Sequence, residues 1–194
     1  MSDTRVSLAA LLENEGTTAR TLFEHLASLT PQQRVEDMRG VPGGKMARLF
    51  TLCADSEPLV ATDIVPEGAT GPIIHEGKNS LPMFSLFQKR FAKQGGAIIG
   101  YNHQTWSFVT GPGYFTVVEV ADKPKELLFD YTKVPESGID GWPKVRSNSG
   151  GFSYFVYRGM HDFCRKVGPS VLIGCALREG KPLDSYFMLT RVDG

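Results

Sequence analysis

The sequence predicts a mainly β protein with N-terminal helices (class α+β), built around an antiparallel, up-and-down β-barrel of the lipocalin or calycin type. Helical periodicity dominates the first part of the chain, whereas apolar residues recur with a period of two from residue 97 onward. The breaks between the later segments, such as "GPG", "DKPK" and "EGK", are so short that neighbouring strands must be antiparallel. All 194 residues are expected to form one domain, in which residues 1–95 pack on or cap a barrel of residues 96–194.

Three helices are expected in the N-terminal part. The first lies in "TTARTLFEHLASLTPQQ", where a threonine caps the start and the Thr-Pro pair ends the helix. The second lies in "GKMARLFTLCAD". The third lies in "SLPMFSLFQKRFAK", with Ser80 as its N-cap and Gly95 and Gly96 beyond its end. Between the last two, residues 56–79 are predicted to be loop with one or two short strands, because proline and glycine interrupt their β-branched runs.

About eight strands are expected after residue 97, and several of them are apolar on both faces. A sheet with one face in water would alternate regularly between apolar and polar residues. The pattern therefore favours a barrel with an interior lined by side chains and an outer face partly covered by the helices. The alternation does not tell which face points inward. The segment "PESGIDGWPKVRSNSGG" is expected to be a lid or mouth loop. The predicted strands are "AIIGYN", "TWSFVT", "GYFTVVEVA", "ELLFDYTKV", "GFSYFVYRG", "MHDFCRKV", "SVLIGCALR" and "LDSYFMLTRV".

Charge and cysteine content exclude several classes of protein. Twenty-one basic residues balance twenty-one acidic ones, so we expect no nucleic-acid partner. No apolar run approaches the ~20 residues of a membrane span. The apolar stretch at the start of the chain is too short for the core of a signal peptide. Three cysteines without CxxC spacing argue against a disulfide framework. We therefore expect a soluble cytoplasmic protein that does not bind membranes, and a homodimer stays open.

Common catalytic and metal-binding signatures are missing from the sequence. It contains no GxSxG, HExxH or Walker loop, and its four histidines are isolated from other ligand types. No metal and no cofactor are therefore expected. Covalent catalysis by Cys164 would need a base across the barrel, and no residue of the sequence identifies one.

Asp130 is an acid in the apolar strand "LLFDYTKV". A buried carboxylate needs a partner, so an inward Asp130 predicts a pair with Arg158 or Arg165, either structural or orienting a substrate. In "RGMHDFCRKV", Arg158 and Asp162 share one strand face, while His161 and Arg165 share the other, so only one of these pairs can face a ligand.

Several short motifs occur in an order that resembles one group of small proteins. "LFEHLASLTPQQRVEDMRG" resembles an opening helix with a proline turn and a glycine-ended segment, and "LFQKRF" resembles a "GKxF" element. "LLFDYTKVP" resembles an apolar strand ending in Asp-Tyr, and "YRGMHDFCRKVGPSVLIGCAL" with "SYFMLTR" resembles a C-terminal hairpin and closing strand. The chain is thus similar to GxWxG-type proteins with calycin-like barrels, although "RGVPGG" stands where the motif has its tryptophan.

The resemblance implies a barrel fold, and small fungal barrels of similar size act as cofactor-free cyclases, including hetero-Diels–Alderases. The leading prediction is therefore a cofactor-independent enzyme of secondary metabolism that binds an apolar molecule and catalyses cyclisation, dehydration or isomerisation. A lipocalin-like carrier is the alternative, and a filled barrel acting through a partner surface is a third reading. The predicted catalytic residues are Asp130, Arg158, Asp162, Arg165 and the turn residue His103. The predicted substrate-binding residues are Trp106, Phe108, Tyr114, Tyr154, Tyr186 and Met188.

Overall fold

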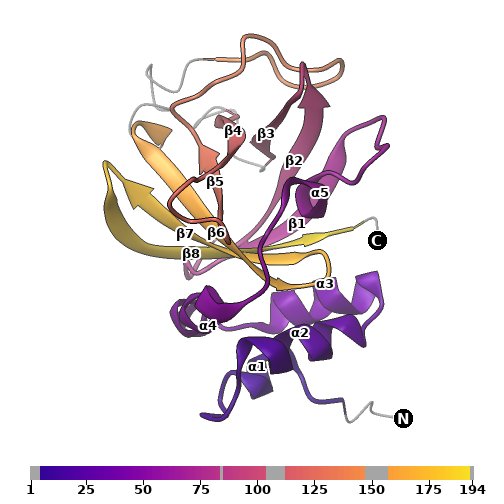
Figure 1. Cartoon of the computed structure of the whole chain (residues 1–194), viewed down its shortest axis with the longest axis vertical. Coiled ribbons are helices and arrows are strands. Elements are labelled where there is room, and N and C mark those ends of the chain that lie inside the picture. The colour runs from indigo at the N-terminus through magenta and orange to yellow at the C-terminus, as the bar shows by residue number, and fades with distance from the viewer. Residues whose placement is uncertain (1–4, 84, 104–111, 147–156, 193–194) are drawn as a thin grey trace.

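The computed structural model describes residues 5–83, 85–103, 112–146 and 157–192. In these residues the strands form a closed antiparallel barrel in sequence order, and β8 pairs back with β1 (Figure 1). The predicted fold class is thereby confirmed. The strands are β1 (Ile73–Asn79), β2 (Leu86–Gln94), β3 (Ala97–His103), β4 (Tyr114–Glu119), β5 (Leu127–Asp130), β6 (Met160–Gly168), β7 (Val171–Arg178) and β8 (Lys181–Arg191).

The N-terminal helices are short and begin at clear caps. Thr18 accepts a hydrogen bond from the Thr21 amide at the start of α2, and Thr30 forms a capping box with Gln33 at the start of α3. The first two predicted helices are confirmed, whereas α3 was not predicted. The helices are α1 (Leu8–Leu11), α2 (Ala19–Ala27), α3 (Pro31–Gly40), α4 (Met46–Leu52) and α5 (Ala61–Ile64), with 3-10 turns η1 (Gly43–Lys45) and η2 (Cys53–Asp55) on either side of α4.

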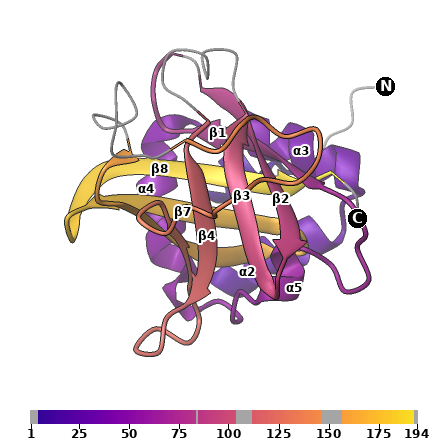
Figure 2. The same cartoon turned by 90° about the horizontal axis from the view of Figure 1, so that it is seen from above.

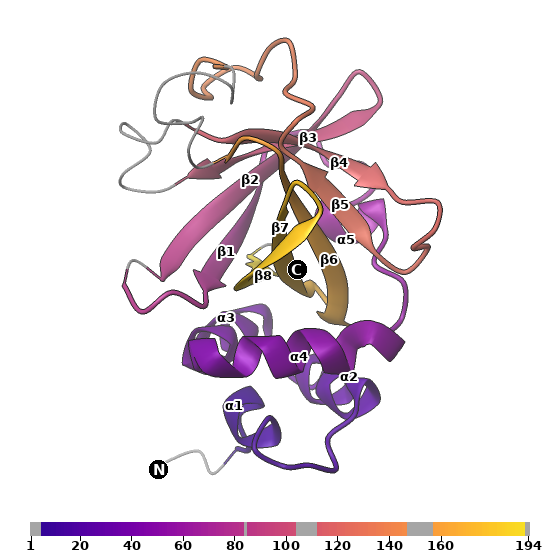
Figure 3. The same cartoon turned by 90° about the vertical axis from the view of Figure 1, so that its left-hand side faces the viewer.

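Helices α1 to α4 form one layer below the barrel (Figures 1 and 3), and the strands lie in front of this layer when seen from above (Figure 2). The layer packs on the outer face of β6 to β8, as the sequence predicts for the helical part. Leucines of α2 and α4 share a core with outward-facing residues of the strands, which include Val171, Ile173 and Met188. These strands are therefore apolar on both faces because the helices cover the outer one.

The helix predicted over residues 80–93 is wrong, because Leu86–Gln94 is strand β2. Its apolar residues fit both a helical and an alternating pattern, and the barrel uses the alternating one, with Phe87, Lys89 and Phe91 on the inward face. Gly95 and Gly96 have φ angles of +55° and +84° and form the β2–β3 hairpin turn instead of ending a helix. The barrel therefore begins at Ile73 with β1, which is a short strand within residues 56–79, where one or two were predicted. Two other predicted strands, at 105–110 and 151–159, lie wholly or largely outside the described residues.

The two ends of the barrel differ. One end, which we call the closed end, is covered by α5 and the chain before it, and Leu59 and Ile64 belong to the interior core. Polar bonds fix this cover: Arg191 donates to the Asp63 carbonyl at 2.7 Å, and Lys166 binds the Asp63 carboxylate at 3.0 Å. Figure 1 shows α5 on the same side as the end of β8. The opposite end, called the mouth, carries the β1–β2, β3–β4, β5–β6 and β7–β8 connections.

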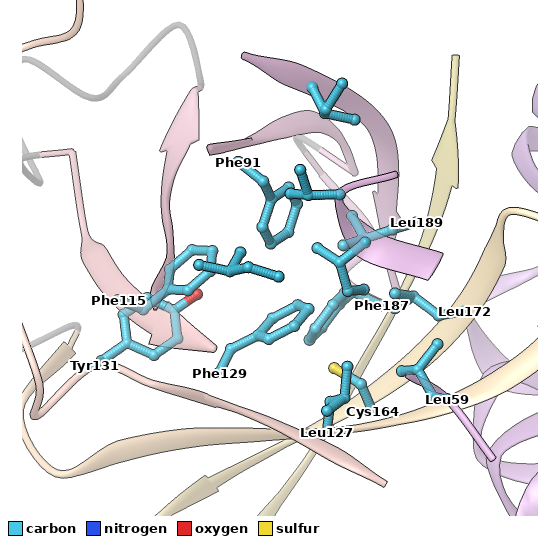
Figure 4. Packing of buried hydrophobic residues seen from close by; sticks show 14 of the residues in the cluster. Leu59, Phe91, Phe115, Leu127, Phe129, Tyr131, Cys164, Leu172, Phe187 and Leu189 are labelled. Atoms are coloured by element: carbon cyan, nitrogen blue, oxygen red, sulfur yellow. The ribbon is translucent and has the colours of Figure 1, made fainter. Parts of the chain in front are cut away.

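Phenylalanine rings fill much of the interior between these ends (Figure 4). Three of the rings lie flat over inward-facing glycines of a neighbouring strand. A Cβ atom at any of these glycines would come within 2.7 Å of ring atoms, so only glycine leaves room for the ring. The cross-strand pairs are Gly77 with Phe87, Gly100 with Phe115, and Gly174 with Phe187.

Candidate functional site

Lys89 is a charged residue on the inward face of β2. It lies between Phe87 and Phe91 along the strand, and only 3% of its side chain is exposed. Taking an ammonium group out of water is costly unless the group is paired and hydrogen-bonded. The groups around the Nζ atom of Lys89 therefore define a polar site inside the barrel.

Asp162 and Tyr131 supply the hydrogen bonds of this ammonium group. Lys89 Nζ donates to Asp162 Oδ2 at 3.2 Å and to the Tyr131 hydroxyl at 2.5 Å. The Tyr131 hydroxyl in turn donates to Asp162 Oδ2 at 3.2 Å, which closes a triangle of three polar groups. Asp162 points inward from β6, and Tyr131 directly follows β5, so three strands contribute to one site.

Asn102 completes the polar group. It faces Lys89 in the register of β2 and β3, and its Nδ2 atom donates to the Tyr131 hydroxyl at 3.2 Å. The hydroxyl thus accepts from Lys89 and Asn102 and donates to Asp162, which uses its donor and both lone pairs. The ring of Tyr157 stacks on the Tyr131 ring at 5.4 Å between centroids and fixes its plane. We call Lys89, Asn102, Tyr131 and Asp162 the mouth cluster.

Five aromatic rings lie within 6.0 Å of the ammonium group. Lys89 Nζ lies 4.6 Å from the ring centroid of Phe187 and 4.9 Å from that of Phe115. The rings of Phe129, Tyr131 and Phe87 follow at 5.6, 5.1 and 6.0 Å. The faces of such rings attract a cation, and the attraction grows when water is excluded. Figure 4 shows Phe115, Phe129 and Phe187 converging on one region of the interior near Tyr131.

Burial controls the protonation of the acidic groups in this site. It raises the pKa of Asp162 above the ordinary value of an aspartate, although the charge of Lys89 and hydrogen bonds from Lys89 and Tyr131 oppose the shift. Burial, with the charge of Asp162, raises the pKa of Tyr131 well above its ordinary value, so the phenol keeps its proton. Cys164, next along the inward face of β6, is also buried, and its raised pKa keeps it a thiol.

The position of the mouth cluster along the barrel follows from the register. Lys89 and Asp162 lie near the starts of β2 and β6, while Asn102 and Tyr131 lie at the ends of β3 and β5. All four positions are at the mouth. The phenylalanine rings and α5 fill the interior between these residues and the closed end. A ligand that reaches the polar groups would therefore enter from the mouth.

Of the five predicted catalytic residues, Asp162 alone belongs to the mouth cluster. Asp130 lies on the outer face, where it accepts from the Thr132 amide at 2.9 Å and lies 3.4 Å from His161. A pair with Arg158 or Arg165 was predicted for an inward Asp130, but Asp130 faces outward, and Arg165 pairs with Glu126 at 2.7 Å. Both Asp130 and Arg165 point away from the barrel interior, because each is one position away from an inward-facing residue of its strand.

The remaining two predicted catalytic residues are exposed. Arg158 lies just before β6, in the mouth-side connection. His103 is the last residue of β3 and lies on the face opposite Asn102, with its ring against the edge of Tyr101 at 6.1 Å. Burial, with the charge of Arg90, lowers the pKa of His103. Neither residue shares the barrel interior with Lys89.

The predicted substrate-binding residues that the structure describes lie on the outer face. Tyr114 donates its hydroxyl to the Pro143 carbonyl at 2.6 Å and packs beside Trp142. Tyr186 contacts Phe50 of α4, and Met188 lies in the core between barrel and helices. Trp106, Phe108 and Tyr154 lie outside the described residues.

Sequence reasoning missed Lys89, Asn102 and Tyr131 as site residues. The helix predicted over residues 80–93 hides the alternation of "FQKRF", in which a lysine replaces an apolar residue between two inward phenylalanines. A charged residue at an inward position between aromatic residues is the sequence signal that could have identified Lys89 as a site residue. Asn102 and Tyr131 carry no such signal, because their polar atoms matter only through contacts across the barrel.

Comparison with known protein families, with curated proteins and with solved structures finds no match for this chain. Fold and site therefore define it as a closed antiparallel barrel with a polar cluster at its mouth. Among the described residues, no group of three or more histidine, cysteine or acidic side chains could hold a metal ion. None of the described helices has the length and apolar content needed to cross a membrane. The three cysteines, Cys53, Cys164 and Cys175, are buried and free.

Proposed function

We propose that this protein is a cofactor-independent enzyme that binds an apolar small molecule at the barrel mouth and catalyses its cyclisation, dehydration or isomerisation. The observation that carries the proposal is the mouth cluster, a buried lysine–aspartate pair with a tyrosine hydroxyl inside an aromatic barrel. Buried charge is rarely needed to stabilise a fold, because apolar residues of similar volume serve equally well. The pair is therefore best explained by chemistry at the mouth.

The cluster offers complementary groups for a substrate that carries a carbonyl or hydroxyl oxygen. The Lys89 ammonium and the Tyr131 hydroxyl can donate to that oxygen and stabilise negative charge that develops on it. The Asp162 carboxylate can accept a proton, and the pKa raised by burial makes it a stronger base than an exposed aspartate. These interactions are stronger inside the aromatic surroundings than in water, because the local dielectric constant is low.

The aromatic surroundings favour an apolar substrate body. The rings of Phe87, Phe115, Phe129 and Phe187 offer a large apolar surface around the polar groups. The resemblance to small barrel cyclases supports a reaction of secondary metabolism, with the reacting parts of the substrate held close together. We also place the protein in the cytoplasm, where its three buried thiols stay reduced.

A carrier of hydrophobic ligands is the second candidate, and the same aromatic surface favours it. The two functions differ in what they require of the mouth cluster. A carrier of a neutral ligand keeps its affinity when the polar groups are replaced, whereas the enzyme loses its rate.

Depletion of metabolites tests the proposal. The purified protein is incubated with a metabolite extract of the organism that encodes it, and mass spectrometry identifies compounds that are consumed and formed. We expect Lys89→Met, Asp162→Asn and Tyr131→Phe each to reduce turnover by about 100-fold or more, the usual effect of losing an acid–base or charge-stabilising group. The matched control is Lys93→Met, which makes the same change at an exposed position of β2 and should keep full turnover.

Circular dichroism and thermal unfolding show whether each variant is folded. Folded variants with full turnover would contradict the assignment of the site. A compound that binds at the mouth but is never converted, with equal affinity for wild type and Asp162→Asn, would instead identify a carrier.

A further inference from the structure

We propose that Lys89 is a covalent nucleophile, and that the substrates of the mouth site are aldehydes or ketones that form an imine with its Nζ atom. This inference rests on the proposed function and deepens it, because it names the substrate class and the reacting atom. Its basis is the arrangement around Nζ: a carboxylate at 3.2 Å, a phenol at 2.5 Å, and two phenylalanine rings whose centroids lie 4.6 and 4.9 Å away.

The first requirement of imine formation is an amine that can lose its proton. Asp162 is the neighbouring acceptor, and transfer of one proton from Nζ to Oδ2 converts a buried ion pair into two neutral groups. The acceptor is already in place, because Lys89 Nζ donates a hydrogen bond to Asp162 Oδ2 at 3.2 Å. The pKa of Asp162, raised by burial, also favours this transfer.

The second requirement is a route for the carbonyl oxygen to leave as water. The lone pair of Nζ attacks the carbonyl carbon, and a proton passes from nitrogen to the carbonyl oxygen through the Tyr131 hydroxyl, which gives the carbinolamine. Protonated Asp162 then donates its proton to the new hydroxyl group. The C–O bond breaks, water leaves, and nitrogen forms a double bond to carbon. In the overall reaction, the lysine ammonium and the carbonyl compound give an iminium ion and water. Asp162 is a carboxylate again at the end.

Imine formation leaves the net charge of the buried site unchanged. The iminium carries the same single positive charge as the ammonium it replaces, so Asp162 has a cationic partner both before and after the step, whenever it is a carboxylate. The rings of Phe115 and Phe187 attract either cation. Asn102 and Tyr157 hold the Tyr131 hydroxyl in place before and after the step through a hydrogen bond and a ring stack. The site is thus preorganised for both states.

An iminium also explains how one site serves the proposed reactions. It withdraws electrons from the neighbouring carbon and makes its C–H bond acidic, and the Asp162 carboxylate lies beside it as a base. Removal of that proton gives an enamine, from which double-bond shift, loss of a β-hydroxyl group or ring closure onto a second carbonyl can follow. Each of these ends with hydrolysis of the imine and return of the free lysine.

Reductive trapping tests the inference without knowledge of the natural substrate. The full-length protein is incubated with 3-phenylpropanal and sodium cyanoborohydride, which reduces an iminium to a stable secondary amine. Each trapped lysine gains the mass of the aldehyde less one oxygen atom. Peptide mapping then compares Lys89 with Lys93, an exposed lysine of the same strand. We expect Lys89 to be modified about tenfold faster or more, because Asp162 lies 3.2 Å from its Nζ atom and can accept the proton that blocks attack, whereas Lys93 is exposed to water. Modification of Lys93 without Lys89 would overturn the inference.

Two variants separate this inference from the proposed function. Lys89→Arg keeps a cation beside Asp162 but cannot form an imine, so the Lys89 adduct and turnover of the natural metabolite should both disappear in a folded protein. Asp162→Asn should slow trapping at Lys89 while leaving Lys93 unchanged. If Lys89→Arg retains turnover, the covalent step is excluded while the proposed function stands. If neither Asp162→Asn nor Tyr131→Phe lowers turnover, the proposed function itself fails.

Discussion

Two pairs of a basic side chain and a buried aspartate lie on opposite sides of the barrel wall, and their surroundings differ. In the helical layer, His25 Nε2 lies 2.6 Å from Asp37 Oδ2, and the same oxygen accepts from the backbone amide of Leu8 at 3.0 Å. This pair therefore ties α2 and α3 to the start of α1. Inside the barrel, Lys89 and the Asp162 carboxylate bond to each other and to the Tyr131 side chain.

The difference separates a pair that holds the fold from a pair that is available for chemistry. A carboxylate that accepts a backbone amide at a helix start has a structural use even when no ligand is present. Lys89 and Asp162 instead bond to side chains across the barrel, and a ligand of matching chemistry can re-use their groups.

The largest effect is expected when one partner of the mouth pair is removed. Asp162→Leu leaves the Lys89 ammonium buried without its counter-charge, and we expect the free energy of unfolding to fall by about 3–5 kcal/mol. The double variant Lys89→Met/Asp162→Leu removes both charges and should return to within about 1 kcal/mol of the wild type, since apolar residues of similar volume replace such pairs well. Urea unfolding of the wild type and both variants measures these values.

The double variant is also expected to be inactive. A stable, inactive protein would show that the pair is retained for function. If the double variant is as unstable as Asp162→Leu alone, the mouth pair stabilises the fold, and the distinction between the two pairs is lost.

The closed end holds a buried base, His75, which is expected to make stability depend on pH. Burial lowers the pKa of His75 to about 4, with the charge of Arg191 adding to this shift and a bond to the Ile64 carbonyl opposing it. The unfolded chain has the ordinary histidine value of about 6.5. Between these values the unfolded state binds more protons, so stability is lost as the pH falls from about 6.5 to about 4.

The part due to His75 amounts to at most about 3 kcal/mol. His75→Gln removes this titration, and urea unfolding across that pH range should show a flatter profile for the variant than for the wild type. Parallel profiles would mean that His75 is accessible to water and that α5 covers the closed end less tightly than the structure shows.

A medium effect is expected at the structural pair. Asp37→Asn removes the carboxylate that joins His25 to the Leu8 amide, and we expect a loss of about 1–3 kcal/mol, the usual cost of weakening buried hydrogen bonds to a charged group. Thermal unfolding measures it. Turnover per folded molecule should equal that of the wild type, and a selective loss of turnover would show that the helical layer acts on the site.

The fold was predictable from the sequence because its determinants are local. Alternation and short turns indicate antiparallel strands, and caps such as Thr18 indicate helix starts. The error at β2 arose because "FSLFQKRF" satisfies both periods, and only the partner strands decide between them. The inward face could not be predicted, since rings bury one face of β8 and helices bury the other.

The site was less predictable because its members are far apart in the chain. Lys89 and Asp162 are separated by 73 positions, and Lys89 and Tyr131 by 42. The apolar strand around it makes Asp130 a candidate, but local bonds to Thr132 satisfy this carboxylate, whereas Asp162 is a candidate only through the face that it shares with Arg158. Which of two such acids faces the interior depends on the register of the closed barrel.

The smallest effect is expected from two variants that remove hydrogen bonds of a neutral side chain. Asn102→Ala deletes bonds to the Tyr131 hydroxyl and, at 3.5 Å, to the Gly113 carbonyl, and Tyr114→Phe deletes a part-buried bond to the Pro143 carbonyl on the outer face. Each should lower the free energy of unfolding by about 1 kcal/mol. Their stabilities should therefore be similar, so a difference in turnover cannot come from stability.

Only Asn102→Ala should lower kcat, because it frees the hydroxyl that relays protons between Lys89 and Asp162, whereas Tyr114→Phe leaves the mouth cluster untouched. Steady-state kinetics on the metabolite found by depletion measures both variants. Tyr114 is also a predicted substrate-binding residue, so a rise in KM for Tyr114→Phe would favour a ligand on the outer face, beside Trp142, and would contradict a site inside the barrel.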